Sequence, residues 1–211
     1  MIENRTKITI DAYNKCAPIF AKIFTNYKSY QKILAKFQNK YLKETSTILD
    51  IGCGPGNNTK LLFDLNNNYQ ITGVDLSDKM INLAKKSAPY CNFLVQDIRQ
   101  LEFSNTFDAI IASFCIVHLT NEETIQLLQK INKILNVGGY LYLSFMAGKK
   151  SGFKTTSFSK KLFYFNYFDK NYIIENLKKS SFKILDIVQE DYKEPNNTLT
   201  NEYFVFAQKH N

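Results

Sequence analysis

A chain of 211 residues is long enough for one globular domain with a single buried core. Its content of 45% hydrophobic and 22% charged residues is ordinary for a soluble protein and argues against a disordered or fibrous one. The formal net charge of +8 permits an anionic partner, but the lysines are scattered, which favours a solvated basic surface over a nucleic-acid site.

Cysteine spacing and hydropathy exclude further classes of protein. The four cysteines stand far apart with no CxxC pair, so we expect neither a zinc site nor a disulfide framework, and a cytoplasmic location is the simplest. The longest apolar stretch, Ala109 to Leu119, is too short for a membrane-spanning helix, which needs roughly 20 residues. Residues 1–11 are polar and lack the apolar core of a signal peptide, so secretion is not expected.

Short apolar runs alternate with helical patterns from Thr47 onward, a rhythm typical of βα units and a parallel sheet. Before them, residues 10–42 are predicted to form helices that lie against the domain. Strands are expected at 47–51, 69–75, 92–95, 107–113, 140–145, 182–188 and 202–207, the last two separated by a polar turn at 195–197. Between the fifth and sixth strands, a lysine- and aromatic-rich stretch (149–168) precedes a helix at 169–179.

Two helix starts carry capping signals. The Ser77 hydroxyl can accept from free amides of the helix that follows the second strand. Thr120 and Glu123 form a capping box, in which each side chain bonds to the other residue's backbone. The apolar stripe of that helix is expected to reach Leu135, and Gly138-Gly139 to end it.

The strongest functional signal is the segment 49–56, a strand that runs into a turn with glycines at alternate positions. Glycines let the backbone bend sharply and approach a ligand because no Cβ stands in the way. A dinucleotide fingerprint would place its third glycine where this chain has Asn57. Asp50, before the first glycine, would repel a pyrophosphate but suits an ammonium group. The combination favours a ligand that carries an amino acid over NAD.

Two further acidic residues end the second and third predicted strands. Asp75 lies about 20 residues beyond the turn, where a carboxylate can accept both hydroxyls of a ribose; capping of the next helix is the alternative. Asp97 could accept a hydrogen bond from an adenine amino group, with Ile98 offering backbone donors and apolar contact.

In order and spacing, these segments resemble the class I S-adenosylmethionine (SAM)-dependent methyltransferases, particularly small ones that act on metabolites. The resemblance covers residues 47–208 and is carried by ILDIGCGPG (48–56), GVDLS (73–77), QDI (96–98), FDAIIAS (107–113) and LNVGG (135–139). It implies an α/β, three-layer Rossmann-like fold: a seven-stranded sheet, mostly parallel with an antiparallel last strand, and helices on both faces. It also implies a single methyltransferase domain (1–211) with an N-terminal helical extension (1–45), a cofactor-binding half (46–148) and a lid and substrate-side half (149–211).

The resemblance implies SAM as the cofactor and assigns residues to its parts. Asp50 and the glycines would hold the methionine part, Asp75 the ribose and Asp97 the adenine. Tyr13 is similar to the helix-borne tyrosine that closes over the cofactor in many relatives. The cofactor-binding residues expected are Tyr13, Asp50, Gly52, Cys53, Gly54, Gly56, Asp75, Leu76, Met80, Asp97, Ile98 and Ser113. No metal ligands are expected, and the transfer should be a metal-free SN2 reaction.

Two residues of the loop after the fourth strand, Cys115 and His118, have side chains that could act as catalytic groups. Relatives that methylate nucleic-acid bases carry a Pro-Pro-aromatic or Pro-Cys signature there, and this chain has neither, so Cys115 is expected as a buried small residue. Nucleic-acid methylation is thereby disfavoured. His118 is the catalytic candidate because its near-neutral pKa suits a general base, and a purely structural hydrogen-bonding role stays open.

The acceptor pocket is expected between the N-terminal helices, the loop 113–119 and the stretch 149–168. Its candidate aromatic residues are Tyr13, Phe20, Tyr27, Phe114, Phe153, Phe158, Phe163, Tyr164, Phe165 and Tyr167. Aromatic side chains suit a flat small molecule, and nearby lysines could suit a carboxylate. Three hypotheses stand: methyl transfer to O, N or C of a small molecule; an RNA or protein methyltransferase; and a non-catalytic SAM-binding module. The oligomeric state does not follow from the sequence.

Overall fold

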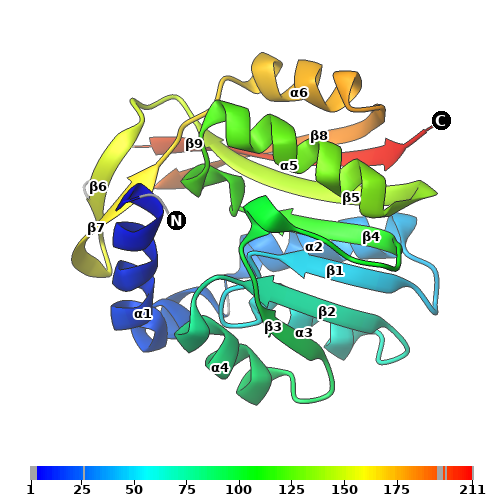
Figure 1. Cartoon of the computed structure of the whole chain (residues 1–211), viewed down its shortest axis with the longest axis horizontal. Coiled ribbons are helices and arrows are strands. Elements are labelled where there is room, and N and C mark those ends of the chain that lie inside the picture. The colour runs from blue at the N-terminus through cyan, green and yellow to red at the C-terminus, as the bar shows by residue number, and fades with distance from the viewer. Residues whose placement is uncertain (1–3, 26, 194–196, 198, 211) are drawn as a thin grey trace.

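The computed structural model describes residues 4–25, 27–193, 197 and 199–210. In this part of the chain a seven-stranded sheet has the order β3-β2-β1-β4-β5-β9-β8 (Figure 1). Its strands are β1 (Thr47–Ile51), β2 (Gln70–Asp75), β3 (Asn92–Val95), β4 (Phe107–Ser113), β5 (Leu135–Ala147), β8 (Phe182–Lys193) and β9 (Leu199–Lys209). Strand β9 pairs antiparallel with both neighbours, whereas the pairs from β3 to β5 are parallel. The predicted Rossmann-like sheet with an antiparallel last strand is confirmed.

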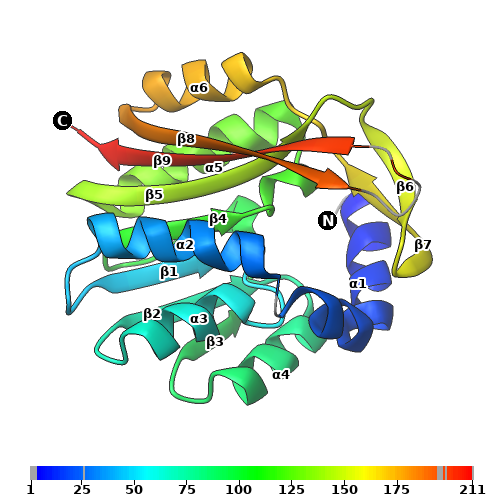
Figure 2. The ribbon, with the colours of Figure 1, turned by 180° about the vertical axis from the view of Figure 1, so that it is seen from behind.

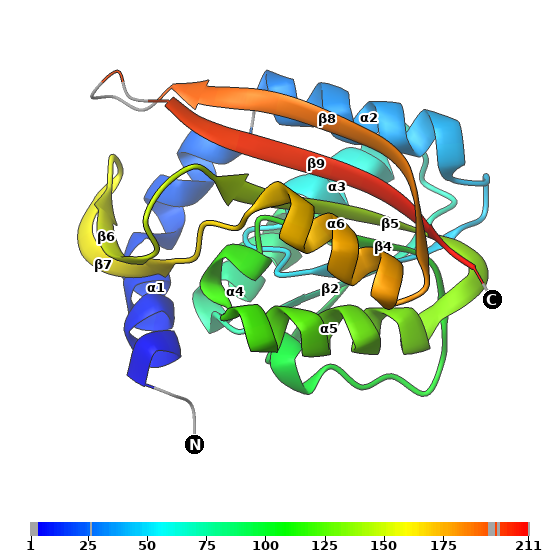
Figure 3. The same ribbon diagram turned by 90° about the horizontal axis from the view of Figure 1, so that it is seen from above.

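Helices cover both faces of the sheet. They are α1 (Asn4–Phe24), α2 (Lys28–Tyr41), α3 (Asn57–Leu65), α4 (Asp78–Ser87), α5 (Asn121–Ile134) and α6 (Lys170–Lys179), with short 3-10 turns η1 (Ile98–Gln100) and η2 (Ile116–His118). Helices α2 and α3 lie on one face and α5 and α6 on the other (Figures 2 and 3). Apolar side chains of β4 and β5 are buried in both layers, as expected for central strands covered on two sides.

Both predicted caps are confirmed. The Ser77 hydroxyl accepts a hydrogen bond from the Met80 backbone N–H. Thr120 and Glu123 make the full capping box, with each side chain accepting from the other residue's backbone N–H. These local bonds set where α4 and α5 begin, and therefore where the preceding loops leave the sheet edge.

Several boundaries differ from the sequence prediction, among them those of β5 and β9, which are both longer than predicted. Helix α5 ends at Ile134, because Leu135 is already extended and pairs with Phe107 as the first residue of β5. Helix α1 begins at Asn4, ahead of the predicted start. Strand β8 continues to Lys193. Its second half is mostly exposed and polar and shows no apolar alternation, and it is held by pairing with β9. Of the turn predicted at 195–197, positions 195 and 196 lie outside the described residues.

The stretch 149–168 contains a two-stranded hairpin that the sequence prediction missed. Strands β6 (Gly152–Thr156) and β7 (Ser159–Phe165) pair antiparallel and form a separate small sheet. The hairpin packs against α1, and both lie beyond the carboxyl ends of the parallel strands (Figure 1). The two thus stand over the sheet edge where the predicted functional residues gather. None of the helices described is long and apolar enough to cross a membrane.

Candidate active site

A cavity of about 600 Å³ lies at the carboxyl ends of β1, β2 and β4, beneath α1 and the β6–β7 hairpin. Strand β1 pairs with β2 on one side and β4 on the other, so this edge is the switch point of the sheet, where open α/β folds bind ligands. The predicted residues that line it are Tyr13, Gly52, Cys53, Gly54, Asp75, Leu76, Met80, Asp97, Ile98, Ser113 and His118. Asp50 and Gly56 do not line it.

The turn after β1 requires glycine for two separate reasons. Gly52, Gly54 and Gly56 have φ of 64°, 55° and 84°, a left-handed conformation that residues with a Cβ rarely adopt. A Cβ added to Gly52 would lie 2.4 Å from the Cβ of Cys115, so the turn and the loop after β4 are packed in direct contact. The backbone of this turn thereby forms a wall of the cavity.

The Asp75 carboxylate is held in one orientation at the end of β2. Its Oδ2 accepts the Gly54 backbone N–H at 2.9 Å, and its Oδ1 accepts the Ser77 N–H at 2.8 Å. Burial raises the pKa of Asp75, and the hydrogen bonds from Ser77 and Gly54 oppose that rise. The result is an oriented carboxylate at the cavity wall, anchored to the glycine turn.

Asp50 lies behind the turn, fully buried. Its Oδ2 accepts from the Thr59 hydroxyl at 2.7 Å, whereas its buried Oδ1 has no hydrogen-bond partner among the described residues. Burial raises the pKa of Asp50 to about 7. The structure therefore does not place this carboxylate in the cavity, where direct contact with an ammonium group would require it.

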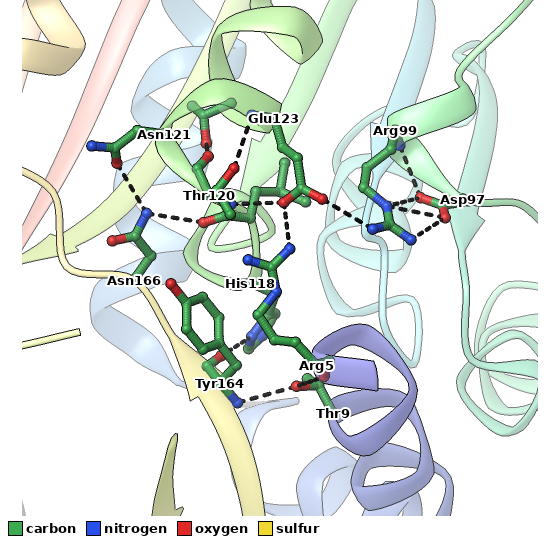
Figure 4. A network of polar contacts seen from close by, with 12 residues as sticks. Arg5, Thr9, Asp97, Arg99, His118, Thr120, Asn121, Glu123, Tyr164 and Asn166 are labelled. Carbon is green, nitrogen blue, oxygen red and sulfur yellow. Dashed lines mark hydrogen bonds and ion pairs between the residues drawn. The ribbon is translucent and has the colours of Figure 1, made fainter. Parts of the chain in front are cut away.

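The predicted adenine residue, Asp97, belongs to a chain of ion pairs that the sequence analysis missed (Figure 4). Arg99 forms an ion pair with Asp97, in which its Nη2 lies 2.8 Å from Oδ2. Its Nη1 donates to Oε1 of Glu123 at 3.0 Å. Arg5 of α1 donates to the other Glu123 oxygen at 2.7 Å. Against the effect of burial, the bonds from Arg99 hold the pKa of Asp97 below its usual value. Only Arg99's position two residues after Asp97 could have signalled this pairing.

His118 is held between two partners from different elements. Its Nδ1 lies 2.8 Å from the Tyr164 carbonyl oxygen of β7 (Figure 4), and its Nε2 lies 2.9 Å from the Tyr13 hydroxyl of α1. A carbonyl oxygen only accepts, so Nδ1 carries the proton and Nε2 accepts from Tyr13. Burial lowers the pKa of His118 to about 4, so the ring is neutral at pH 7. His118 thus lines the cavity with its Nε2 hydrogen-bonded to the Tyr13 hydroxyl.

Some of the other residues predicted in the loop 113–119 and the stretch 149–168 line the cavity, and others do not. Cys115 is buried against Gly52, and burial raises the pKa of its thiol, as suits a packing residue. Of the aromatic candidates, those that line the cavity are Tyr13, Phe20, Tyr27, Phe114, Phe158, Phe165 and Tyr167. Phe163 is buried beneath α1, and Phe153 is 45% exposed on the hairpin. The lining residues that the sequence prediction missed include Phe24, Tyr30, Tyr192 and Glu202.

The doubly wound sheet, its glycine turn and the cavity at its switch point define a Rossmann-like ligand-binding protein. Residues 48–139 match a family model described as a methyltransferase domain. Over its full length the fold is similar to the magnesium protoporphyrin IX methyltransferase of Synechocystis PCC 6803, solved with bound SAM. The TM-score is 0.74 at 18% identity, over 99% of this chain and 98% of that one.

Two curated relatives match shorter segments. The chain is 31% identical to the carboxy-S-adenosyl-L-methionine synthase of Campylobacter concisus over 122 residues, which is 56% of this chain and 52% of that protein. It is 42% identical to the trans-aconitate 2-methyltransferase of Enterobacter sp. over 72 residues, 34% of this chain and 29% of that protein. The chain thus spans about half or less of these relatives. Residues 48–139 are thus similar to a methyltransferase domain, and the whole chain has the fold of SAM-dependent methyltransferases.

Proposed function

We propose that this protein is a SAM-dependent methyltransferase that transfers a methyl group to a small-molecule acceptor. One observation carries the proposal: a carboxylate, Asp75, is oriented by two backbone N–H groups in the wall of a cavity at the sheet's switch point. A carboxylate held in this way can accept two ribose hydroxyls side by side. Two of the methyltransferases similar to this chain have names that specify small acceptors, trans-aconitate and magnesium protoporphyrin IX.

The residues present fit SAM as the cofactor. The glycine turn leaves the cavity wall at Gly54 open, since a Cβ there would meet no atom nearer than 3.9 Å. Beside Asp75, Leu76 and Met80 supply apolar surface for a flat ring, and Asp97 and Ile98 follow along the same wall. When bound, SAM supplies a methyl group that its sulfonium already activates. The role of each of these residues is part of the proposal.

In this proposal the chain contributes by positioning the acceptor and excluding water. Helix α1 and the hairpin cover the cavity, and Tyr13, Phe20 and Phe158 pack edge to face between them. Holding the two reactants together in a dry cavity accelerates a displacement without further chemistry. Where the acceptor must lose a proton, the Tyr13 hydroxyl faces it and the neutral Nε2 of His118 stands behind as the proton acceptor.

Titration calorimetry with S-adenosylhomocysteine and SAM tests the cofactor assignment. The wild type should bind both with micromolar affinity, and Asp75→Asn should weaken binding about 100-fold, since two hydrogen bonds to a charged group are impaired. Asp78→Asn is the matched control: it removes the same charge three residues further on, from the exposed first turn of α4.

Thermal melts should show both variants folded, because the asparagine side chain retains one acceptor oxygen for the turn. Equal binding by wild type and Asp75→Asn would refute the ribose assignment. No binding of either ligand to the folded wild type would refute the proposed function. If both ligands bind, an assay with radioactive SAM and candidate acceptors comes next. Labelled acceptor would show methyl transfer, and its absence would leave binding alone or the synthase reaction named for one relative.

A further inference from the structure

The cavity extends away from Asp75 to a corner formed by β9 and α2. Glu202 of β9 lies opposite Met146, near the end of β5, so it stands at the same sheet edge as the glycine turn. Strands β1, β4 and β5 separate it from Asp75 of β2, which corresponds to about 19 Å at the usual strand spacing. If SAM binds at Asp75, this corner is left for the methyl acceptor. The family model stops at residue 139 and does not include it.

Glu202 is a carboxylate set into an apolar wall. It is 1% exposed, although it lines the cavity, and its Oε2 accepts the Tyr30 hydroxyl of α2 at 2.7 Å. Burial and then the charge of Glu202 raise the pKa values of Tyr27 and Tyr30. A carboxylate in the wall of a cavity can form an ion pair with a positively charged group of a ligand.

Four aromatic rings line the cavity with this carboxylate. Tyr27 and Tyr30 have ring centroids 4.4 Å apart, Tyr192 lies 6.0 Å from Tyr27, and Phe114 lies 5.2 Å from Tyr30. Rings grouped around one acidic side chain are the arrangement that binds organic ammonium groups, through cation–π attraction to the ring faces and an ion pair with the carboxylate.

We propose that Glu202, Tyr27, Tyr30, Tyr192 and Phe114 form a subsite for an organic cation, and that the methyl acceptor carries a positively charged amino group held there. The inference rests on the proposed function and names the substrate class for that site. The competing feature is a pair of lysines, Lys149 and Lys154, on the lid side of the cavity. Both are partly exposed, and the Lys154 ammonium sits 4.4 Å from the ring centre of Tyr167. A carboxylate-bearing acceptor at these lysines is the opposing outcome.

Three probes of one shape distinguish these outcomes: 2-phenylethylammonium, neutral 2-phenylethanol and anionic 3-phenylpropionate. Each is titrated into the protein saturated with S-adenosylhomocysteine. The wild type should bind the ammonium about 10-fold more tightly than the alcohol, as an ion pair and a cation–π contact together provide. Glu202→Gln keeps the shape and an acceptor for Tyr30, and it should reduce that preference to less than twofold.

The matched control is Glu175→Gln, which removes the same charge from the exposed surface of α6 and should leave the preference intact. Should Glu202→Gln fail to fold, Tyr192→Leu removes one ring of the subsite and should lower ammonium affinity by about threefold. Ammonium binding no tighter than alcohol binding, tighter binding of the carboxylate, or an unchanged preference in Glu202→Gln would overturn the inference. The prior S-adenosylhomocysteine titration reports separately on the proposed function, because it can succeed when the ammonium fails to bind.

Discussion

At the scale of single residues, the hydrogen bonds of Tyr13 and His118 determine which atoms of this pair can donate or accept a proton. The Tyr164 carbonyl oxygen fixes the histidine tautomer, and that tautomer turns its free lone pair toward the Tyr13 hydroxyl. Burial raises the pKa of Tyr13 and lowers that of His118, so both groups are neutral at pH 7. The near-neutral pKa expected of His118 is therefore wrong, because burial in the packed chain lowers it to about 4 and the sequence pattern alone does not reveal that burial.

The depressed pKa of His118 predicts a loss of stability in acid. Its folded pKa of about 4 lies below the ordinary value of 6.5, so between these pH values the unfolded chain binds a proton that the folded protein does not. Stability is then lost as the pH falls from about 6.5 toward 4. The histidine's share of the change from pH 7.5 to pH 5 should be about 2 kcal/mol of unfolding free energy.

Urea unfolding at the two pH values measures this loss, and His118→Gln isolates it. Glutamine offers one donor and one acceptor in place of the ring but does not titrate. The raised pKa of Asp50 acts in the opposite direction in both proteins and cancels in the comparison. An identical pH dependence in wild type and variant would show that His118 is not the neutral, buried group described above.

Among the elements, α1 is the one whose attachment controls access to the cavity. Arg5 joins it to Glu123 of α5, and its guanidinium lies 4.7 Å from the ring centre of Tyr164 on the hairpin. The Thr9 hydroxyl accepts the Tyr164 backbone N–H at 3.1 Å (Figure 4). Because Glu123 also binds Arg99, the attachment of α1 is linked to the wall that contains Asp97.

Loosening this attachment should show in α1 itself. Arg5→Gln leaves the Glu123 carboxylate, only 16% exposed, with one cation fewer, and should lower the free energy of unfolding by about 1–2 kcal/mol. Amide hydrogen exchange in α1 (Asn4–Phe24) should accelerate more than in the central strands, and S-adenosylhomocysteine should dissociate several times faster. Lys7→Gln, the same charge change at an exposed position of the same helix, is the control. Equal exchange rates in the two variants would contradict this role for Arg5.

At the scale of the whole molecule, the positive charge is dispersed. Exposed lysines stand on α2, α4 and α6, which lie on different sides of the sheet (Figures 1 and 3), whereas the cavity wall carries acidic groups at Asp75, Asp97 and Glu202. Dispersed charge suits solubility, while nucleic-acid recognition requires basic groups gathered on one surface.

Salt dependence tests this distribution. Between 50 and 200 mM KCl, affinity for S-adenosylhomocysteine should change less than about threefold, because no array of counterions is displaced. A fluorescent 20-nucleotide single-stranded RNA should bind only weakly at 50 mM and be released at 200 mM, as measured by anisotropy. Tight RNA binding that persists at 200 mM would instead support the RNA methyltransferase alternative.

What the sequence by itself determined lies in segments of short range. Strand positions, the caps at Ser77 and Thr120, the glycine turn and the strand-end carboxylates Asp75 and Asp97 all follow from patterns a few residues long, because backbone geometry and hydrogen bonding act locally. The order of these segments also indicated the parallel sheet. The β6–β7 hairpin escaped prediction because its turn at Ser157-Phe158 has none of the Asn-Gly or Asp-Gly chemistry that marks tight hairpins.

Only the tertiary structure decided which distant residues share the cavity. Tyr30 and Glu202 are 172 positions apart, and Arg5 and Glu123 are 118 apart, yet each pair is joined by a hydrogen bond of 2.7 Å. The fold also placed Asp50 behind the turn, outside the cavity wall. No local pattern encodes these placements, since they depend on how α1, α2 and the antiparallel β9 pack around the sheet edge. The physical reason is that burial and charge pairing are properties of the packed chain, whereas strand and turn signals are properties of neighbouring residues.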